Sequence, residues 1–338
     1  MIETLPLTPI ESWQVQLRQV VTSIDELLRL LQLQRQDVRY SEEAERDFPL
    51  RVPLAFVRRM RAGDPADPLL LQVLASTDEL QVTPGYSDDP VGECGTANPQ
   101  PGIIHKYRGR VLLMVASSCA INCRYCFRRH FPYQENQNSR RQWRQALSYI
   151  ASEPSIEEVI FSGGDPLIAN DRLLAELVEQ IAAIPHVCRL RIHSRLPVVL
   201  PDRVTNELLD AINHPDLQTV MVIHSNHGNE IDNIVGDAVA AMRSREITVL
   251  NQAVLLRGVN DNTASLVELS EKLFAAGVLP YYLHLLDKVA GAAHFDLPES
   301  DARRLMGEVS TRLPGYLVPR LVREEAGAGA KTGVAFAT

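Results

Sequence analysis

The stretch Val111-Leu112-Leu113-Met114-Val115-Ala116 is a short apolar run that indicates a buried β-strand. Comparable runs recur at Val159–Phe161, Leu190–Ile192, Thr219–Ile223, Thr248–Leu255 and Leu279–Leu286. Helical patterns follow them at Arg141–Ile150, Asp171–Ile184, Val204–Ile212, Ala238–Arg245, Ser265–Ala276 and Asp301–Leu313. Six strand–helix units in series predict an α/β fold with a parallel sheet.

Unusual polar residues mark the end of each apolar run. They are Cys119, Cys123 and Cys126, then Ser162–Pro166, His193–Arg195, His224–His227, Asn251 with Gln252, and Asp287 with Lys288. In a βα barrel all strand ends meet at one mouth, whereas an open sheet gathers such residues only where its strand order reverses. Periodicity alone fits both architectures, but the even distribution of polar ends favours a partial, TIM-like (βα)6 barrel.

The regions on either side of this barrel have a different character. Residues 1–104 are expected to form a mainly helical region, beginning with apolar residues at helical spacing from Trp13 to Leu31 that would bury one face. Shorter helical patterns follow near Leu54–Met60 and Leu69–Leu74, and the Pro- and Gly-rich stretch Thr83–Pro101 indicates a long loop. The barrel is predicted over 105–322 and a C-terminal segment over 323–338.

Composition limits the class of protein. The 338 residues are 45% hydrophobic and 22% charged, as in a globular protein, and the net charge of −8 argues against binding to nucleic-acid phosphates. The sequence predicts no membrane helix and no signal peptide, and we expect a cytoplasmic protein. Three of the five cysteines lie within eight residues, which favours metal binding in a reducing compartment over disulfides. Cys94 and Cys188 stand apart as bystanders.

The motif Cys119-x3-Cys123-x2-Cys126 is typical of an iron–sulfur ligand set. Three thiolates can hold three irons of a 4Fe–4S cluster and leave the fourth open to chelate S-adenosylmethionine (SAM). Structural zinc is the alternative, because His130 would complete a Cys3His set, although zinc ligands usually come in two separated pairs. A redox dithiol is disfavoured because no thioredoxin pattern surrounds the motif.

Ser162-Gly163-Gly164-Asp165 follows the second predicted strand. Two glycines let the backbone approach a ligand closely, and beside the cysteine loop they would hold the amino group of SAM. The same four residues could also form an ordinary turn.

The cysteine and glycine motifs in successive units resemble the radical SAM superfamily. Further motifs resemble the lysine 2,3-aminomutase family, and most of all its short forms that make β-lysine for modification of elongation factor P. They include Cys123–His130, Arg195–Val199, Asn251-Gln252, Pro280–Leu283, His105–Arg108 and the Gly/Ala-rich lead into Lys331. The longer, catabolic members carry an additional C-terminal segment and zinc-binding cysteines that this sequence does not match.

The resemblance implies a 4Fe–4S cluster, SAM and pyridoxal phosphate (PLP) as cofactors, and site roles for particular residues. It implies that Lys331 forms the Schiff base with PLP, that Lys106, Tyr107 and Arg110 hold the PLP phosphate, and that His224 and Gln252 lie near SAM. It also implies that Arg128 binds the substrate carboxylate and that Asp287 and Glu324 bind the far ammonium of lysine. Catabolic members have aspartate in place of Glu324, which leaves the stereochemistry of the product open.

The activity implied is a 1,2-amino shift that converts L-lysine to β-lysine. The partners implied are a flavodoxin- or ferredoxin-like reductant, the ligase that modifies elongation factor P, and a second copy of the chain in a homo-oligomer; membranes and nucleic acids are not expected. Arginine and ornithine are alternative substrates, while Asp287 and Glu324 would repel glutamate. A non-catalytic iron–sulfur or zinc protein that binds nucleic acid through Arg128, Arg129 and His130 is a more distant alternative.

Some of these residues also have simpler explanations. Gln252 could be a hydrogen-bonded amide in the core, and His224 and His227 could be structural histidines. Lys331, taken without the resemblance, is a lysine in a flexible Gly/Ala-rich tail.

Overall fold

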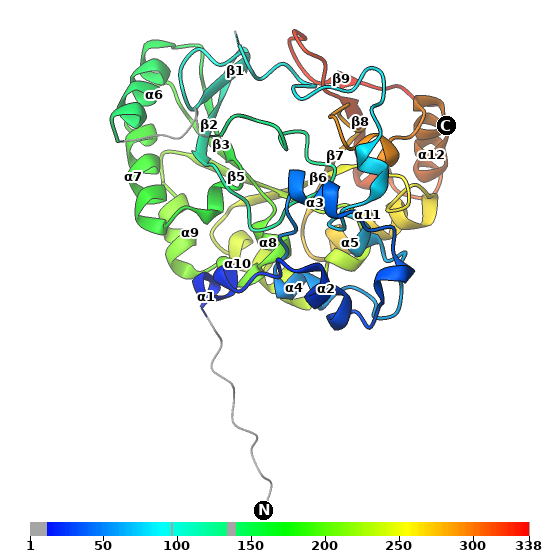
Figure 1. Ribbon diagram of the computed structural model, residues 1–338. Helices are drawn as coiled ribbons and strands as arrows, with labels where there is room; N and C mark the ends of the chain where they lie inside the picture. Colours follow the sequence, from blue (N-terminus) through cyan, green and yellow to red (C-terminus); the bar gives the residue numbers. More distant parts are fainter. Residues whose placement is uncertain (1–11, 96, 134–139, 338) are drawn as a thin grey trace, which may run out of the picture.

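A computed structural model describes residues 12–95, 97–133 and 140–337 and places one curved sheet at the centre of the molecule (Figure 1). Within these residues the sheet has nine strands in chain order. They are β1 (Ile103–Tyr107), β2 (Arg110–Ala116), β3 (Glu158–Gly163), β4 (Arg189–Ser194), β5 (Gln218–His224), β6 (Thr248–Val254), β7 (Leu279–His284), β8 (Arg320–Arg323) and β9 (Thr332–Gly333). Strands β2 to β8 run parallel, and β1 and β9 pair antiparallel at the two edges.

Helices form an outer rim around the strands (Figure 1). One longer helix follows each strand from β2 to β7: α6 (Arg140–Ser152), α7 (Asp171–Ala182), α9 (Asn206–Ile212), α10 (Asn233–Arg243), α11 (Thr263–Ala275) and α12 (Glu299–Ser310). The short α8 (Leu196–Val199) lies between β4 and α9. Because the strand order never reverses, no switch point exists among the described strands, and the predicted partial barrel is confirmed.

The strands alternate between the barrel interior and the helical rim. On β3, Val159 and Phe161 pack into the hydrophobic core, while Ile160 and Ser162 line a cavity. On β6, Ala253 packs into the core, while Gln252 lines the cavity. Strands covered on both faces are apolar along most of their length, which is why the runs were recognisable in the sequence.

Side-chain caps fix where several rim helices begin. The side chains of Asn170, Thr205, Asp232 and Asn262 each accept a hydrogen bond from a backbone N–H in the first turn of α7, α9, α10 and α11, respectively. Each cap satisfies a backbone donor that the helix itself cannot use. The helices therefore begin just after the polar loops that carry the site.

In the part of the N-terminal region that the structure describes, five short α-helices precede the barrel: α1 (Trp13–Arg18), α2 (Ile24–Leu30), α3 (Glu42–Asp47), α4 (Leu54–Val57) and α5 (Pro68–Leu71). The helical pattern predicted from Trp13 to Leu31 is interrupted, although most of its apolar residues are buried. The chain leaves α1 after Arg18 because Val21 forms a β-bridge with Val52, and Ser23 then caps α2. Pairing with a distant segment has overridden the local helical spacing.

The N-terminal helices share one hydrophobic cluster with the barrel, running from Trp13 to Val334. The division into 1–104, 105–322 and 323–338 stays a prediction, because nothing in this shared packing tests the boundaries. None of the described helices combines the length and apolar character required to cross a bilayer.

Candidate active site

A cavity of about 440 Å³ opens at the carboxyl ends of the parallel strands. Each of the predicted site residues contributes to its lining. These are Lys106, Tyr107, Arg110, Cys119, Cys123, Cys126, Arg128, Ser162, Gly163, Gly164, Asp165, His224, Gln252, Asp287, Glu324 and Lys331. The barrel thus collects residues from the whole chain into one site.

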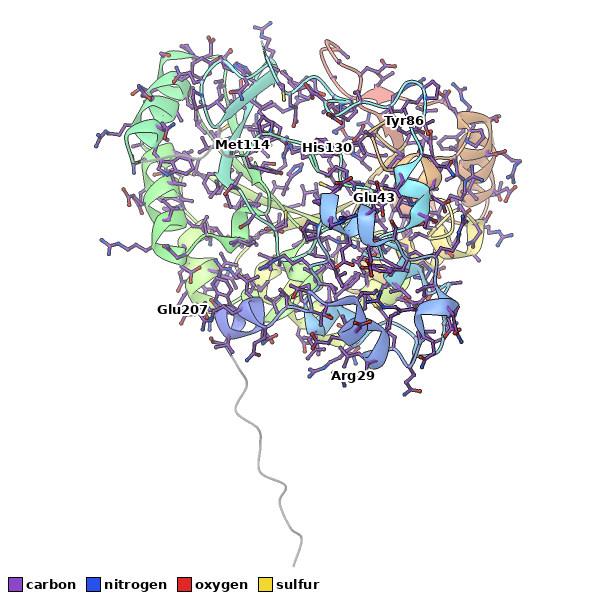
Figure 2. All side chains as sticks on the ribbon, viewed as in Figure 1. Arg29, Glu43, Tyr86, Met114, His130 and Glu207 are labelled. Atoms are coloured by element: carbon purple, nitrogen blue, oxygen red, sulfur yellow. The ribbon has the colours of Figure 1, made fainter. Side chains whose placement is uncertain are left out.

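The cysteine loop crosses the mouth of the barrel. It begins after Ala116, the last residue of β2, and reaches His130, which Figure 2 labels together with Met114 of β2. His130 Nε2 lies 3.2 Å from the carbonyl oxygen of Ala290 after β7. Arg129 donates to the carbonyl of Gly291 on the same side at 3.3 Å. The loop therefore closes over the interior that the strands surround.

The three thiols of this loop lie close enough to influence one another. Burial raises the pKa of Cys119 well above its usual value and that of Cys126 to about 11, and the charges of neighbouring thiols add to both shifts. Among the described residues, no three His, Cys, Asp or Glu side chains surround a single metal-ion position. The three cysteines could instead each bind a different iron of one cluster.

Arg124 anchors the cysteine loop to the N-terminal helices. Its side chain is fully buried and donates to both carboxylate oxygens of Glu79, at 2.8 and 2.5 Å, and to the carbonyl oxygens of Ala44 and Phe48. Arg129 lies 3.0 Å from the same carboxylate. One buried carboxylate therefore holds two arginines of the loop.

The glycine pair allows two backbones to run together. Gly164 N–H donates to the carbonyl of Ala116, and Asp165 N–H donates to that of Ser118, both at 2.8 Å. A Cβ at Gly164 would lie 2.3 Å from the carbonyl oxygen of Ser118. These glycines therefore seat the end of β3 against the start of the cysteine loop.

Asp165 organises the neighbouring strand end. Its carboxylate accepts hydrogen bonds from Ser194 Oγ and from the backbone N–H groups of Leu167, Arg195 and Leu196. Burial raises the pKa of Asp165 even though these donors act in the opposite direction. Its carboxylate is engaged by protein groups, although the residue was predicted as a cofactor contact.

Arg128 is held by a bidentate ion pair with Glu93 from the long loop before β1. The two N···O distances are 2.6 and 2.9 Å, and both side chains are buried. Arg128 also donates to Ser162 Oγ at 2.8 Å and to the Gly163 carbonyl at 3.2 Å. Most donors of this predicted carboxylate-binding residue are therefore already paired.

Glu324 joins three predicted site residues. It accepts hydrogen bonds from Lys106 Nζ at 2.8 Å, from Lys331 Nζ at 2.9 Å and from the Tyr107 hydroxyl. Burial raises the pKa of Glu324, but Lys331, Lys106 and Tyr107 outweigh burial and lower it to about 2. Glu324 is therefore a permanent carboxylate beside two ammonium groups.

Asp287 follows β7 and lies near Glu324 and Lys331. Burial raises the pKa of Asp287 to about 7, and nearby Lys331 acts in the opposite direction. Asp287 can therefore gain or lose a proton in the neutral range, unlike Glu324.

Several buried polar atoms on the cavity wall have no hydrogen-bond partner among the described residues. They are His193 Nε2, His284 Nε2, Gln252 Oε1 and Arg195 Nε. His224 Nε2 contacts Gln252 Nε2 at 3.0 Å, and burial lowers the pKa of His224 to about 3. Unpaired buried polar atoms are costly, so their number on this wall favours a bound ligand or water.

Sequence reasoning missed Gln72, Glu93, Asn226 and Glu230 as contributors to the site. Glu93 and Asn226 line the cavity, and Gln72 and Glu230 lie behind it in one hydrogen-bond network with Arg195. Asn226 stands at a polar strand end, which was a usable signal. Gln72 sits in an ordinary short helical pattern and carried none.

Fold and site together define a class of enzyme: a partial parallel barrel whose first parallel strand, here β2, leads into three clustered cysteines belongs to the radical SAM class. A family model described as a 4Fe-4S single cluster domain matches residues 107–187. A solved radical S-adenosylmethionine methyltransferase from Kitasatospora setae is 14% identical over 52% of this chain and 36% of that chain, with a TM-score of 0.38. This likeness is too distant to carry any argument.

Curated relatives identify the family within that class. An L-lysine 2,3-aminomutase of Escherichia coli (strain K12) is 52% identical over 98% of this chain and 96% of that protein. One of Haemophilus influenzae is 48% identical over 97% and 98%, and one of Clostridium subterminale is 33% identical over 95% and 77%. The chain belongs to the L-lysine 2,3-aminomutase family.

Proposed function

We propose that this chain is a radical SAM, PLP-dependent lysine 2,3-aminomutase that converts L-α-lysine to β-lysine. The observation that carries the proposal is the position of the Lys331 ammonium, 2.9 Å from Glu324 and close enough to lower the pKa of Asp287. A lysine-type ammonium thus lies near two acidic residues of the cavity.

The cavity suits each of the three cofactors. Cys119, Cys123 and Cys126 would hold the cluster. The unpaired atoms of Arg195, which contacts Cys123, and of Gln252 in the same cavity fit a polar ligand such as SAM. Lys331 would carry PLP through its amino group. When bound, the cluster and SAM supply the radical chemistry, and PLP supplies the aldehyde that binds the migrating amino group.

The proposed phosphate subsite of PLP has an excess of positive charge. Lys106 and Lys331 share the single carboxylate of Glu324. Arg110 stacks on the Tyr107 ring at 4.5 Å, and no acidic side chain within the described ranges pairs with it. An anion would balance this charge, which supports the assignment of Lys106, Tyr107 and Arg110.

The substrate is assigned by charge. Once Lys331 holds PLP, Glu324 and Asp287 can accept the three N–H donors of a lysine ε-ammonium. Arg128 lies within the same cavity to attract the carboxylate at the other end of the substrate. The cysteine loop that crosses the barrel mouth would limit the access of water to reactive groups.

The test is anaerobic incubation of the reconstituted enzyme with SAM, PLP, a reductant and a panel of amino acids, followed by chiral product analysis. We expect β-lysine from lysine and little product from glutamate or norleucine. Asp287→Asn should lower kcat/KM for lysine about tenfold for each 1.4 kcal/mol of lost transition-state stabilisation. Asp301→Asn on α12, outside the cavity, is the matched control.

Preferential turnover of arginine or ornithine would replace the substrate assignment and keep the reaction class. Wild-type discrimination between lysine and norleucine in the Asp287→Asn variant would contradict the role of Asp287.

We also propose that the product serves modification of elongation factor P in the cytoplasm, with a flavodoxin- or ferredoxin-like reductant and a β-lysine ligase as functional partners. The sequence resemblance to short family members supports this placement. Assembly as a homo-oligomer is part of the same proposal, and the mass of the purified protein in solution tests it.

A further inference from the structure

Arg195 places a buried positive charge against one of the cluster cysteines. Its Nη1 lies 2.6 Å from the sulfur of Cys123, and 5% of the side chain is exposed. An arginine guanidinium keeps its proton in proteins, so a cation faces this sulfur permanently.

Protein groups fix Arg195 from several sides. Its backbone N–H donates to Asp165 at 2.8 Å, and its Nη2 donates to Gln72 Oε1 at 2.7 Å and to Glu230 at 3.2 Å. The guanidinium also lies 5.3 Å from the centre of the Phe56 ring. Such contacts leave the side chain little freedom to turn away from the sulfur.

The residues that hold Arg195 are themselves locked. Glu230 is fully buried, and its Oε1 accepts hydrogen bonds from Gln72 and from the backbone N–H groups of Asn226 and His227. Asn226 Nδ2 donates both to Gln72 Oε1 at 2.9 Å and to the Tyr125 hydroxyl at 2.7 Å. The network links the N-terminal helices, the ends of β4 and β5, and the cysteine loop.

A fixed N–H donor and a positive charge beside a cluster sulfur change the energetics of electron uptake. Reduction adds negative charge to the cluster, and a nearby cation stabilises that charge strongly in a buried, low-dielectric site. The Glu230 carboxylate, 3.2 Å from Arg195 Nη2, opposes the effect, but the Arg195 guanidinium is the group that contacts the sulfur directly.

We propose that Arg195 is a positioning residue that raises the reduction potential of the cluster by donating to the sulfur of Cys123, and that Gln72 and Glu230 hold it there. The proposal rests on the cluster ligands assigned in the proposed function, but not on lysine as substrate. The step concerned is uptake of one electron by the oxidised cluster from a low-potential donor.

The experiment is a redox titration with dithionite of anaerobically reconstituted protein, followed by EPR, without SAM, PLP or lysine. Arg195→Gln should change the ratio of reduced to oxidised cluster at least tenfold at the wild-type midpoint, a lowering of 59 mV for one electron. Arg195→Lys should shift it less, because it keeps the charge but not the planar donor fork. Iron content is measured for every sample.

Arg203→Gln is the matched control. Arg203 is also a fully buried arginine, but it contacts Asp171, the carbonyls of Leu167 and Ala169, and the Trp13 ring. A wild-type midpoint in iron-loaded Arg195→Gln, or an equal shift in Arg203→Gln, overturns the proposal. Failure of both Arg195 variants to load iron, when Arg203→Gln loads it, also overturns it, because Arg195 then builds the site instead of tuning it. If the variants show the expected shifts in midpoint potential but the wild-type enzyme does not turn over lysine, the proposed substrate is refuted and the role of Arg195 stands.

Discussion

At the scale of single residues, the cavity pairs acidic groups of different character. Glu324 stays ionised because it contacts Lys106 and Lys331, whereas the pKa of Asp287 rises to about 7 because it is buried with less compensation. Two neighbouring carboxyls with separated pKa values can divide the work: one holds a permanent charge and the other responds to the ligand.

The first prediction concerns this response of Asp287. An entering ammonium stabilises the carboxylate and lowers its pKa below 7, so lysine binding near pH 7 should release a fraction of a proton. Lysine affinity should therefore weaken as the pH falls below about 7, where the free protein holds Asp287 protonated. Calorimetric titration of the PLP-loaded protein in buffers of different ionisation enthalpy measures the proton release directly.

Asp287→Asn should remove the part of proton release that lies near pH 7, while Asp301→Asn should leave it unchanged. Equal proton release in wild type and Asp287→Asn would show that another group titrates.

At the scale of elements, the N-terminal helices act as the support of the cysteine loop. Besides the Arg124–Glu79 pair, Asn122 N–H donates to the Arg51 carbonyl at 2.9 Å, and Arg51 Nε donates to the Cys119 carbonyl at 2.8 Å. The loop has no helix or strand of its own between β2 and Tyr133. Turn hydrogen bonds such as that from Cys126 N–H to the Cys123 carbonyl lie within the loop, and the contacts to Glu79 and Arg51 anchor it from outside.

The second prediction tests this support. Glu79→Ala leaves Arg124 and Arg129 buried without their shared carboxylate, which should lower the free energy of unfolding by about 3–5 kcal/mol. Iron loading should fall as well. Chemical denaturation and iron analysis measure the two effects.

Glu43→Gln is the control, because Glu43 on α3 is exposed (Figure 2). It should leave both measurements unchanged. Full iron loading in a destabilised Glu79→Ala variant would mean that the loop forms without this anchor.

The elements differ in how far the sequence predicted them. The strands from β2 to β7 were predicted from local apolar runs, and the rim helices from apolar residues at helical spacing. Both signals lie within short stretches of sequence. β1, β8 and β9 were missed because they are short edge or closing strands whose pairing depends on partners far away in the chain. The break at Val21 was missed for the same reason, since Val52 supplies its partner.

In the site, too, local motifs were predictable from the sequence and contacts with distant residues were not. The site residues implied by the resemblance all line one cavity, and some residue of each polar strand end lines it too. The contacts of these residues could not be predicted: Arg128 pairs with Glu93 and Arg195 with Gln72, and both partners come from regions without a chemical motif. Periodicity places a side chain on a face, but only tertiary packing selects its partner.

At the scale of the whole molecule, the N-terminal helices and the barrel should behave as one cooperative unit. They share a hydrophobic cluster, and the Arg203 guanidinium stacks on Trp13 of α1 at 4.2 Å. The buried Arg124–Glu79 pair and the Arg195–Gln72 hydrogen bond also cross between them. Separating the two parts would expose apolar surface and leave buried charges unpaired.

The last prediction uses the only two tryptophans in the sequence, Trp13 in α1 and Trp143 in α6. Both side chains are buried in the shared cluster, so each reports on its own side of the molecule. In the single-tryptophan variants Trp143→Phe and Trp13→Phe, denaturant titrations followed by fluorescence should agree with far-UV circular dichroism of the same variant in midpoint and slope.

A Trp13 signal that changes at lower denaturant than the dichroism of the same sample would mean that the N-terminal helices unfold first. The cysteine loop would then lose its Arg124 and Arg195 contacts while the barrel is still folded, and iron should be released in that first step. Coincident transitions, with iron lost only in the global step, are the result that a continuous core predicts.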